Sequence, residues 1–263
     1  MNQSVMKAIR LLDLFTEEDQ ELSLKQIADN ARMPKPTAYR LLSSLEQAGM
    51  LEKIKESEHD SRYRLGLKLL ELGHLVAGQL EIRQVALPLM EQLAHHINEV
   101  IHLVIVNQDE AVYIEKVDST RAIRLHTRIG KRSPLYLGSG PKLLLAHLPQ
   151  DRQEHILSAR QLAQPANGSN LTAPLLKAEL RKIREEGYAF SEGEQDVETT
   201  GISYPIYDYE SGVAAALAVS GLSSHFEGEN LERIKEAVRD TADRISTRLG
   251  FRNMNILEGV RET

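Results

Sequence analysis

Two short amphipathic segments on either side of a tight break constrain the fold of this chain more than any other feature of its sequence. Apolar residues recur at helical spacing over 24–31, directly after Ser23, which is a typical helix N-cap. The break at 32–34 contains a proline, and a second helical pattern then runs to Gly49. Two extended stretches within 51–65, joined by a polar segment, predict a β-hairpin. This order of elements is typical of a winged helix-turn-helix.

A winged helix-turn-helix can place its second helix in the major groove of DNA. Arg40 is the best candidate for reading a base, because its planar fork can bond two acceptors on guanine. Lys35, Thr37 and Ser44 are better suited to phosphates, which position a protein without specifying a sequence. The other residues expected to face DNA are Ala38, Tyr39 and Ser43 on the helix, and Lys53, Lys55, Arg62 and Arg64 on the hairpin. Tyr39 is also counted with the apolar side of this helix.

The overall charge does not by itself indicate nucleic-acid binding. The chain has a formal net charge of −6 and a pI of about 5.9, whereas a DNA-binding domain usually shows a basic surface. Basic residues are concentrated locally, because Arg32, Lys35 and Arg40 lie in a stretch, 30–45, that contains no acidic residue. Such a stretch also fits an ordinary solvated face, and pairs of short helices also occur as plain packing units. The spacing alone leaves these alternatives open.

Several functions are excluded by residues and motifs that the sequence lacks. The chain has no cysteine, which excludes disulfides, thiolate metal sites and thiol nucleophiles. Its N-terminal stretch does not resemble a signal peptide, and no run of about 18 apolar residues predicts a membrane span. There is no G-x-S-x-G, Walker or H-E-x-x-H motif, and His95, His96 and His102 do not have zinc spacing. We therefore expect a cytoplasmic protein with no catalytic residues, no metal and no cofactor.

The second half of the chain mixes predicted strands and helices. Strands are expected at 100–106, 111–117, 122–127, 188–190, 202–207 and 213–220, and helices at 67–79, 82–97, 143–147, 175–186 and 231–249. Strands that meet through hairpins, with helices between the groups, predict a mainly antiparallel sheet in an α/β (α+β) domain. The expected organisation is a winged helix-turn-helix at 1–65, a linker helix at 66–80, a second domain at 81–250 and a tail at 251–263.

Motifs in both halves resemble one family of bacterial regulators. The runs 22–28 and 34–45, followed by Gly49 and by the segment 63–73, closely resemble the N-terminal domain of the isocitrate lyase regulator (IclR) family. The stretches 127–136, 186–189, 205–208 and 219–221 are similar to its effector-binding domain, which implies a GAF-like fold. Arg32 departs from the family pattern, which commonly has glycine in this turn. If the turn requires a positive φ, arginine there has a steric cost.

The resemblance implies a DNA-binding transcriptional regulator, expected to repress a sugar-acid or carbohydrate catabolic operon. It implies three partners: a double-stranded DNA operator, a small carboxylate effector, and further copies of the chain in a homodimer or homotetramer, with no membrane. Ile101-His102-Leu103 and the stretch 128–136 look most like the 2-keto-3-deoxygluconate regulators of this family. The alternative is a small-molecule enzyme whose N-terminal domain docks protein. Recovery of the ligand unchanged after long incubation would argue against that enzyme.

A glycine-rich loop before a predicted helix is the candidate effector site. Gly138, Ser139 and Gly140 let the backbone approach a ligand, and the N–H groups at a helix start favour a carboxylate. The same residues also fit an ordinary helix start with Ser139 as its N-cap. The resemblance adds further residues to the pocket: Ser191, Gly201, Ala218 and Ser220.

Departures from related regulators indicate which ligand this pocket takes. Gly201 and Ala218 stand where relatives often have cysteine and serine, and Pro141 replaces a glycine and removes an N–H donor. We therefore expect a roomier and less polar pocket, suited to a larger ligand than a two- or three-carbon keto acid. Glu192 and Glu194 are candidates for bonding sugar hydroxyls, with a solvated loop as the alternative.

Overall fold

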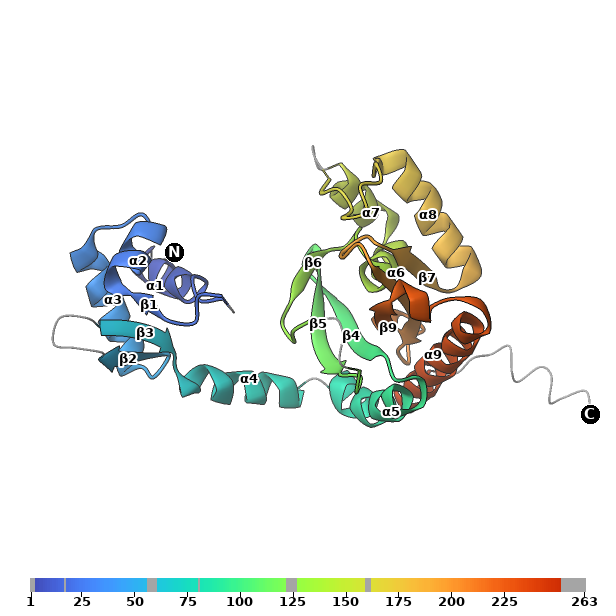
Figure 1. Cartoon of the computed structure of the whole chain (residues 1–263), viewed down its shortest axis with the longest axis horizontal. Coiled ribbons are helices and arrows are strands. Elements are labelled where there is room, and N and C mark those ends of the chain that lie inside the picture. The colour runs from blue at the N-terminus through green and yellow to red at the C-terminus, as the bar shows by residue number, and fades with distance from the viewer. Residues whose placement is uncertain are drawn as a thin grey trace, which may run out of the picture. The chain divides into compact units, whose positions relative to one another are not determined.

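A computed structural model describes residues 3–16, 18–55, 61–79, 81–121, 127–158 and 162–251 of the chain. The chain divides into two compact units, residues 1–80 and 81–263 (Figure 1). The expected strand at 122–127, except for its last residue, and the expected tail, except for its first, lie outside the described residues.

The first unit packs helices against a small antiparallel sheet with the strand order β1-β3-β2 (Figure 1). Its elements are α1 (Gln3–Leu12), β1 (Leu22–Ser23), α2 (Leu24–Asn30), α3 (Lys35–Gln47), β2 (Leu51–Lys55), β3 (Ser61–Leu65) and α4 (Leu67–Gln79). Leu11, Ile27, Leu42 and Tyr63 form the centre of its core. The winged helix-turn-helix expected from the sequence is confirmed, and α4 spans the residues predicted for it. Strand β1 was not expected, because two residues form a strand only by pairing with β3.

The sequence around the break explains how the two central helices are arranged. The Ser23 hydroxyl accepts the Gln26 N–H, and the Gln26 side chain accepts the Ser23 N–H, so α2 begins with a capping box. Pro36 lies in the first turn of α3, where its missing N–H costs no hydrogen bond. Arg32 has a φ of 51°, in the left-handed region. The steric cost anticipated for an arginine in this turn is therefore present, at about 1 kcal/mol.

The second unit is a six-stranded antiparallel sheet with helices on both faces (Figure 1). Its elements are α5 (Glu81–Ile97), β4 (Val100–Asn107), β5 (Glu110–Val117), β6 (Arg132–Pro134), α6 (Ser139–His147), α7 (Gln150–Leu157), α8 (Ala173–Glu186), β7 (Ala189–Glu192), β8 (Thr199–Tyr207), β9 (Val213–Leu222), the 3₁₀ turn η1 (Ser223–His225) and α9 (Gly228–Arg248). The strand order is β6-β5-β4-β9-β8-β7. Helices α5 and α9 pack on one face, and α6 packs on the other between the sheet and α8.

The expected mainly antiparallel sheet is confirmed, and three elements of this unit were not anticipated: α7, β6 and the short 3₁₀ turn η1. Helix α7 is polar along most of its length, with Ile156 and Leu157 buried only at its end, so it shows little helical periodicity. Strand β6 contains Pro134 and forms through pairing with residues 110–112 of β5. Helix α6 also begins at Ser139, four residues before the predicted helix, which places the glycine-rich loop at its first turn.

Candidate functional site

Helix α3 presents a polar and basic face to solvent. Lys35, Arg40 and Ser44 are exposed, and Thr37 and Ser43 are half-buried. The Ser44 hydroxyl donates to the Arg40 carbonyl oxygen at 3.1 Å, which uses its only proton within the helix. Arg40 remains the base-reading candidate because its side chain is exposed, and Ser44 with its proton in use can only accept a further hydrogen bond.

Two sequence predictions for α3 are wrong. Ala38 was expected to face DNA, but its side chain is 0% exposed and packs in the core. Tyr39 was counted with the apolar side, but it is 50% exposed, and the core of the unit takes Leu41, Leu42 and Leu45 instead. The helical repeat of 3.6 residues explains why Ala38 is buried and Tyr39 is exposed, because Ala38 shares a face with Leu41, Leu42 and Leu45 while Tyr39 does not.

The hairpin contributes fewer free cations than its sequence suggests. The guanidinium of Arg64 pairs with Glu52 at 2.9 Å, so its charge is partly compensated. The ammonium of Lys53 lies 5.9 Å from the centre of the Tyr39 ring and 6.0 Å from that of Tyr63, which are cation–π distances. Arg62 is half-buried on β3, and Lys55 ends β2 with its side chain outside the description.

A hollow of about 450 Å³ beside α3 brings Arg32, from the basic stretch noted in the sequence, together with two cations that sequence analysis did not assign to DNA. It is lined by Lys7 and Arg10 from α1, by Arg32 from the left-handed turn, and by Thr37 from α3. Lys7 and Arg10 lie three residues apart on one face of α1, and this spacing is the sequence signal that could have identified them. These side chains enlarge the basic surface next to the recognition helix.

A second, smaller cavity lies in the second unit and collects most of the predicted effector residues. Its lining includes Gly138, Ser139, Gly140, Ser191, Glu194, Gly201, Ala218 and Ser220. The loop before α6, the ends of β7 and β8, and the late part of β9 bring these residues together. Gly138 has a φ of 90°, a conformation that side chains disfavour, so the glycine is required at the start of α6.

Hydroxyl groups fill the space that Gly201 leaves. The Ser203 hydroxyl donates to Ser139 Oγ at 2.7 Å, and the Ser139 N–H donates to Ser191 Oγ at 3.0 Å. A Cβ atom on Gly201 would lie 2.8 Å from Ser139 Oγ and 3.1 Å from Ser191 Oγ. The cavity measures about 40 Å³. The roomy and weakly polar pocket expected from Gly201 and Ala218 is therefore not what the structure shows.

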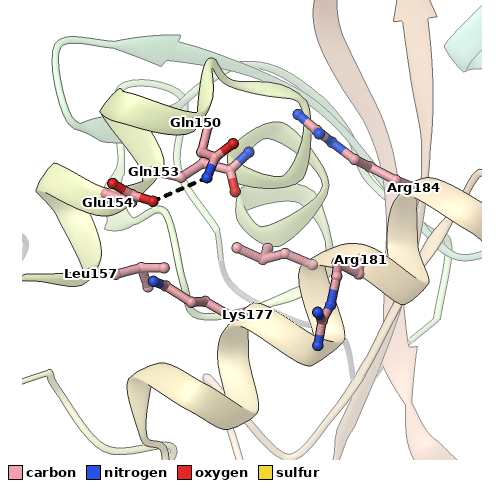
Figure 2. A pocket seen from close by; sticks show the side chains of 8 residues that line it. Gln150, Gln153, Glu154, Leu157, Lys177, Arg181 and Arg184 are labelled. Atoms are coloured by element: carbon pink, nitrogen blue, oxygen red, sulfur yellow. Dashed lines mark hydrogen bonds between the residues drawn. The ribbon is translucent and has the colours of Figure 1, made fainter.

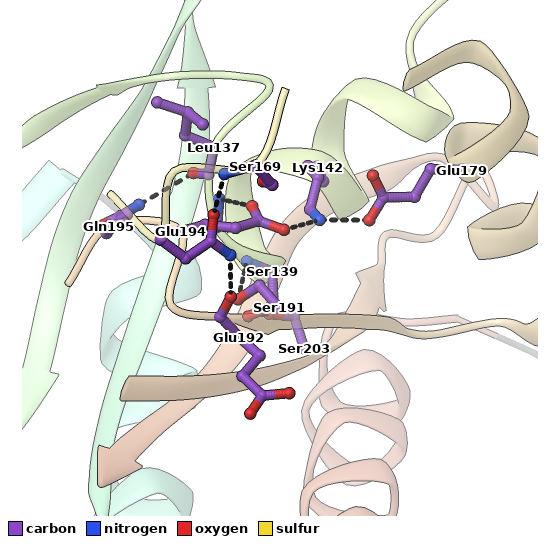
Figure 3. Close-up of polar contacts among 12 residues, drawn as sticks. Leu137, Ser139, Lys142, Ser169, Glu179, Ser191, Glu192, Glu194, Gln195 and Ser203 are labelled. Atoms are coloured by element: carbon purple, nitrogen blue, oxygen red, sulfur yellow. Dashed lines mark hydrogen bonds and ion pairs between the residues drawn. The ribbon is translucent and has the colours of Figure 1, made fainter. Parts of the chain in front are cut away.

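Glu194 is held at the start of α6 by two groups that favour an anion. Its Oε2 accepts the Gly138 N–H at 2.8 Å, and its Oε1 bonds the ammonium of Lys142 (Figure 3). Lys142 is only 1% exposed, and its ammonium also pairs with Glu179 of α8. Helix dipole and cation act on the same carboxylate, so this end of the cavity binds negative charge.

Glu192 lies apart from the cavity, although it was predicted to face the ligand. Its side chain is exposed on β7 and points away from the cluster around Ser139 in Figure 3. Along a strand, alternate residues face opposite sides of the sheet, so Ser191 faces α6 while Glu192 does not. The prediction that Glu192 belongs to the pocket is corrected on this ground.

The opposite wall of the cavity holds His102 of β4 and Tyr113 of β5. Their rings meet edge to face with centroids 5.4 Å apart. Burial, with smaller contributions from Lys116 and Lys131, lowers the pKa of His102 to about 3, so its imidazole is neutral at physiological pH. Burial also raises the pKa of Tyr113, which keeps its hydroxyl protonated.

Gln195 closes the cavity next to Glu194. Its side-chain amide donates to the Leu137 carbonyl at 2.9 Å and to the Tyr113 hydroxyl at 3.2 Å, and its oxygen accepts from Lys131 at 3.2 Å. Sequence reasoning missed Lys142, Gln195, His102 and Tyr113 as lining or supporting residues. Lys142 carried a usable signal, because it directly precedes the apolar run at the start of the helix predicted at 143–147, and a lysine drawn into an apolar environment needs a buried partner.

A third hollow, of about 340 Å³, lies between α7 and α8 and is unrelated to the predicted site (Figure 2). Lys177, Arg181 and Arg184 line it from α8, and Gln150 and Glu154 line it from α7. Arg184 donates to the carbonyl oxygens of Ala146 and Leu148 at the end of α6, so it ties α8 to α6. The groove is open to solvent and contains none of the buried polar groups that the smaller cavity has.

The architecture of the two units defines the chain as a DNA-binding transcriptional regulator with an effector-binding domain. The family model described as "IclR helix-turn-helix domain" matches residues 4–54, and that described as "Bacterial transcriptional regulator IclR C-terminal" matches residues 74–247. The chain belongs to the IclR family, as its sequence motifs predicted. Within the described residues, no helix is long and apolar enough to cross a membrane.

Known relatives cover the chain almost completely. The HTH-type transcriptional regulator KipR of Bacillus subtilis is 34% identical over 95% of this chain and 98% of its own length. The HTH-type transcriptional regulator KdgR of Escherichia coli is 31% identical over 94% of this chain and 93% of its own. A crystal structure of an IclR homolog from Microbacterium hydrocarbonoxydans, complexed with 4-hydroxybenzoate, is 27% identical with a TM-score of 0.82, covering 94% and 99% of the two chains. KipR and KdgR are both described as HTH-type transcriptional regulators.

Proposed function

We propose that this regulator binds an operator of a sugar-acid or carbohydrate catabolic operon and represses it until a small carboxylate, such as 2-keto-3-deoxygluconate, binds. One observation carries the proposal: eight of the nine residues predicted for effector binding line a single polar cavity at the start of α6. A helix start that already holds a carboxylate is suited to an acidic metabolite. The homolog bound to 4-hydroxybenzoate also has a carboxylate ligand.

The ligand's carboxylate is proposed to meet the backbone of Ser139 and Gly140, with Ser220 bonding the same end. His102 is neutral, so it can bond a keto or hydroxyl oxygen but supplies no positive charge. Glu194 was predicted to bond sugar hydroxyls, and its carboxylate is held by the Gly138 N–H and the Lys142 ammonium.

Replacing Ser220 with alanine is expected to weaken binding of 2-keto-3-deoxygluconate by roughly 1 kcal/mol or more, because a buried carboxylate oxygen loses a donor. Titration of the ligand into the protein–operator complex measures this, and the release curve of Ser220→Ala should move to higher ligand concentration. Operator binding without ligand should stay unchanged. The exposed Ser158, at the end of α7, provides a matched control in Ser158→Ala. Identical release curves for Ser220→Ala and the unmodified protein would refute this pocket.

We further propose that the protein works as a dimer or tetramer. A single helix-turn-helix makes few base contacts, so such modules usually bind two half-sites as a pair. Leu67 and Leu70 of α4 are 76% and 71% exposed, an apolar pair one helical turn apart that a second copy can cover. Effector binding can change DNA affinity only if the ligand prefers one arrangement of the assembly. We propose that α4 transmits this preference, because in the sequence it lies between the residues expected to contact DNA and the residues that line the effector cavity.

Light scattering at micromolar concentration is expected to show at least a dimer. Leu67→Glu with Leu70→Glu should shift the protein toward the monomer and weaken binding to a palindromic operator. Leu175 on α8 is 60% exposed, so Leu175→Glu is a control that adds the same charge elsewhere. A monomer that still binds a palindrome tightly would contradict the proposal.

A further inference from the structure

The groups that can receive an effector's carboxylate are already occupied by a carboxylate of the chain itself. Glu194 bonds the Gly138 N–H at 2.8 Å and the buried ammonium of Lys142 (Figure 3). The neighbouring Ser139 N–H donates to Ser191. Because these donors lie at one helix start, a second carboxylate cannot reach them while the Glu194 side chain stays in place.

The size of the cavity also requires lining side chains such as that of Glu194 to move before an effector can bind. At about 40 Å³ the cavity is far smaller than the roughly 300–1,000 Å³ of ordinary small-molecule pockets. An effector the size of a sugar acid must therefore displace lining side chains. Glu194 and Gln195 belong to the loop 193–198 between β7 and β8, and their side chains cover the start of α6 and the wall formed by Tyr113. This loop joins the two strands outside the sheet, so its displacement would leave the pairing of β7 with β8 intact.

A buried histidine without a hydrogen-bond partner is a second, independent indication that the cavity receives a ligand. His102 is 1% exposed and lines the cavity, and its Nδ1 has no hydrogen-bond partner among the described residues. Buried polar side-chain atoms nearly always have a partner, so an atom of this kind in a cavity wall points to a group that binds there.

We propose that Glu194 is a built-in competitor of the effector: the effector's carboxylate takes the place of the Glu194 carboxylate at the N–H groups of residues 138–140 that begin α6 and beside the Lys142 ammonium, while the loop 193–198 opens. The inference rests on the proposed function for the acidity of the effector. Exchange of one carboxylate for another leaves Lys142 paired at every stage, which avoids the large penalty of an unpaired buried charge. A neutral analogue of the effector cannot make this exchange and is therefore rejected.

The experiment uses acetate as the probe, which needs no knowledge of the natural effector. Glu194→Ala in the full chain empties the carboxylate's place, and acetate should then raise the melting temperature saturably, by about 2–4 °C. Chloride at the same ionic strength and neutral acetamide should not do so. The unmodified protein and Glu192→Ala, which changes an exposed glutamate two residues away, should show no such shift. If Glu194→Ala folds poorly, recovery of folded protein with acetate replaces the melting temperature as the readout.

Glu194→Gln provides a second variant, because it removes the charge but keeps the volume. It should not gain stability from acetate, since its side chain still blocks the place. Equal effects of acetate and chloride on Glu194→Ala would overturn the proposal, and so would equal effects of acetate on Glu194→Ala and the unmodified protein.

Titration with 2-keto-3-deoxygluconate separates this inference from the proposed function. Glu194→Ala is expected to bind it about tenfold more tightly than the unmodified protein does, a factor within the usual range of coupling between sites. Weaker binding by Glu194→Ala would mean that Glu194 contacts the effector and would overturn the competitor role. If the sugar acid binds neither protein but acetate still raises the melting temperature of Glu194→Ala, the proposed effector is refuted. The proposal that a carboxylate can replace that of Glu194 is then retained.

Discussion

Replacing Lys142 with methionine is expected to lower the free energy of unfolding by roughly 3–5 kcal/mol, the usual cost of removing one partner of a buried ion pair. Lys142 is 1% exposed, and its ammonium is shared between Glu179 and Glu194. Methionine fills nearly the same volume, so a cavity does not contribute. Because Glu179 is about a third exposed and can turn to water, we expect a value toward the lower end.

Urea unfolding of the full chain at constant pH measures this change. The control is Lys182→Met on α8, which removes an exposed lysine that pairs with Glu186 at 3.6 Å and should cost less than about 0.5 kcal/mol. The double variant Lys142→Met with Glu194→Gln should recover part of the loss, since it no longer leaves Glu194 as a charge without its cation. Equal losses for Lys142→Met and Lys182→Met would show that the buried pair does not stabilise the fold.

The fold was largely predictable because periodicity and caps are local properties of a sequence. Helix α4 and the capping box of α2 follow from residues within a few positions of each other. The residues that fill the cavity depend instead on contacts distant in sequence. Glu194 and Gly138 are 56 positions apart, and Gln195 and Tyr113 are 82 apart. No local pattern indicates that such residues meet.

The sequence therefore predicted which residues line the candidate effector site, but not how neighbouring side chains fill its space. Motifs placed Gly138, Ser191 and Ser220 on one cavity, as the structure does. They also predicted open space at Gly201, because a missing side chain was taken as missing volume. In the structure the hydroxyls of Ser139 and Ser191 use that space. Volume in a closely packed interior is shared among neighbours, so a small residue alone does not predict a larger pocket.

At the DNA surface, Arg40→Ala is expected to weaken operator binding by about 1–3 kcal/mol and to relax the preference for one base pair. Arg40 is exposed on α3, so its loss should not change the stability of the fold. Lys53→Ala is the matched comparison, since Lys53 is a cation of the hairpin on β2, with its ammonium beside the Tyr39 ring. A phosphate contact carries no sequence information, so this variant should weaken all DNA sequences about equally.

Binding of both variants to the operator and to unrelated DNA, measured over a range of salt concentrations, separates the two roles. Loss of a phosphate contact lowers the slope of log affinity against log salt by about 1, so Lys53→Ala should show this change on both DNAs. Arg40→Ala should instead lose affinity mainly for the operator, which narrows the ratio between specific and non-specific binding. If Arg40→Ala binds the operator as tightly as the unmodified protein, α3 does not read bases through this arginine. The cations around the hollow of Lys7, Arg10 and Arg32 would then be the next residues to replace, because they form the other basic surface beside α3.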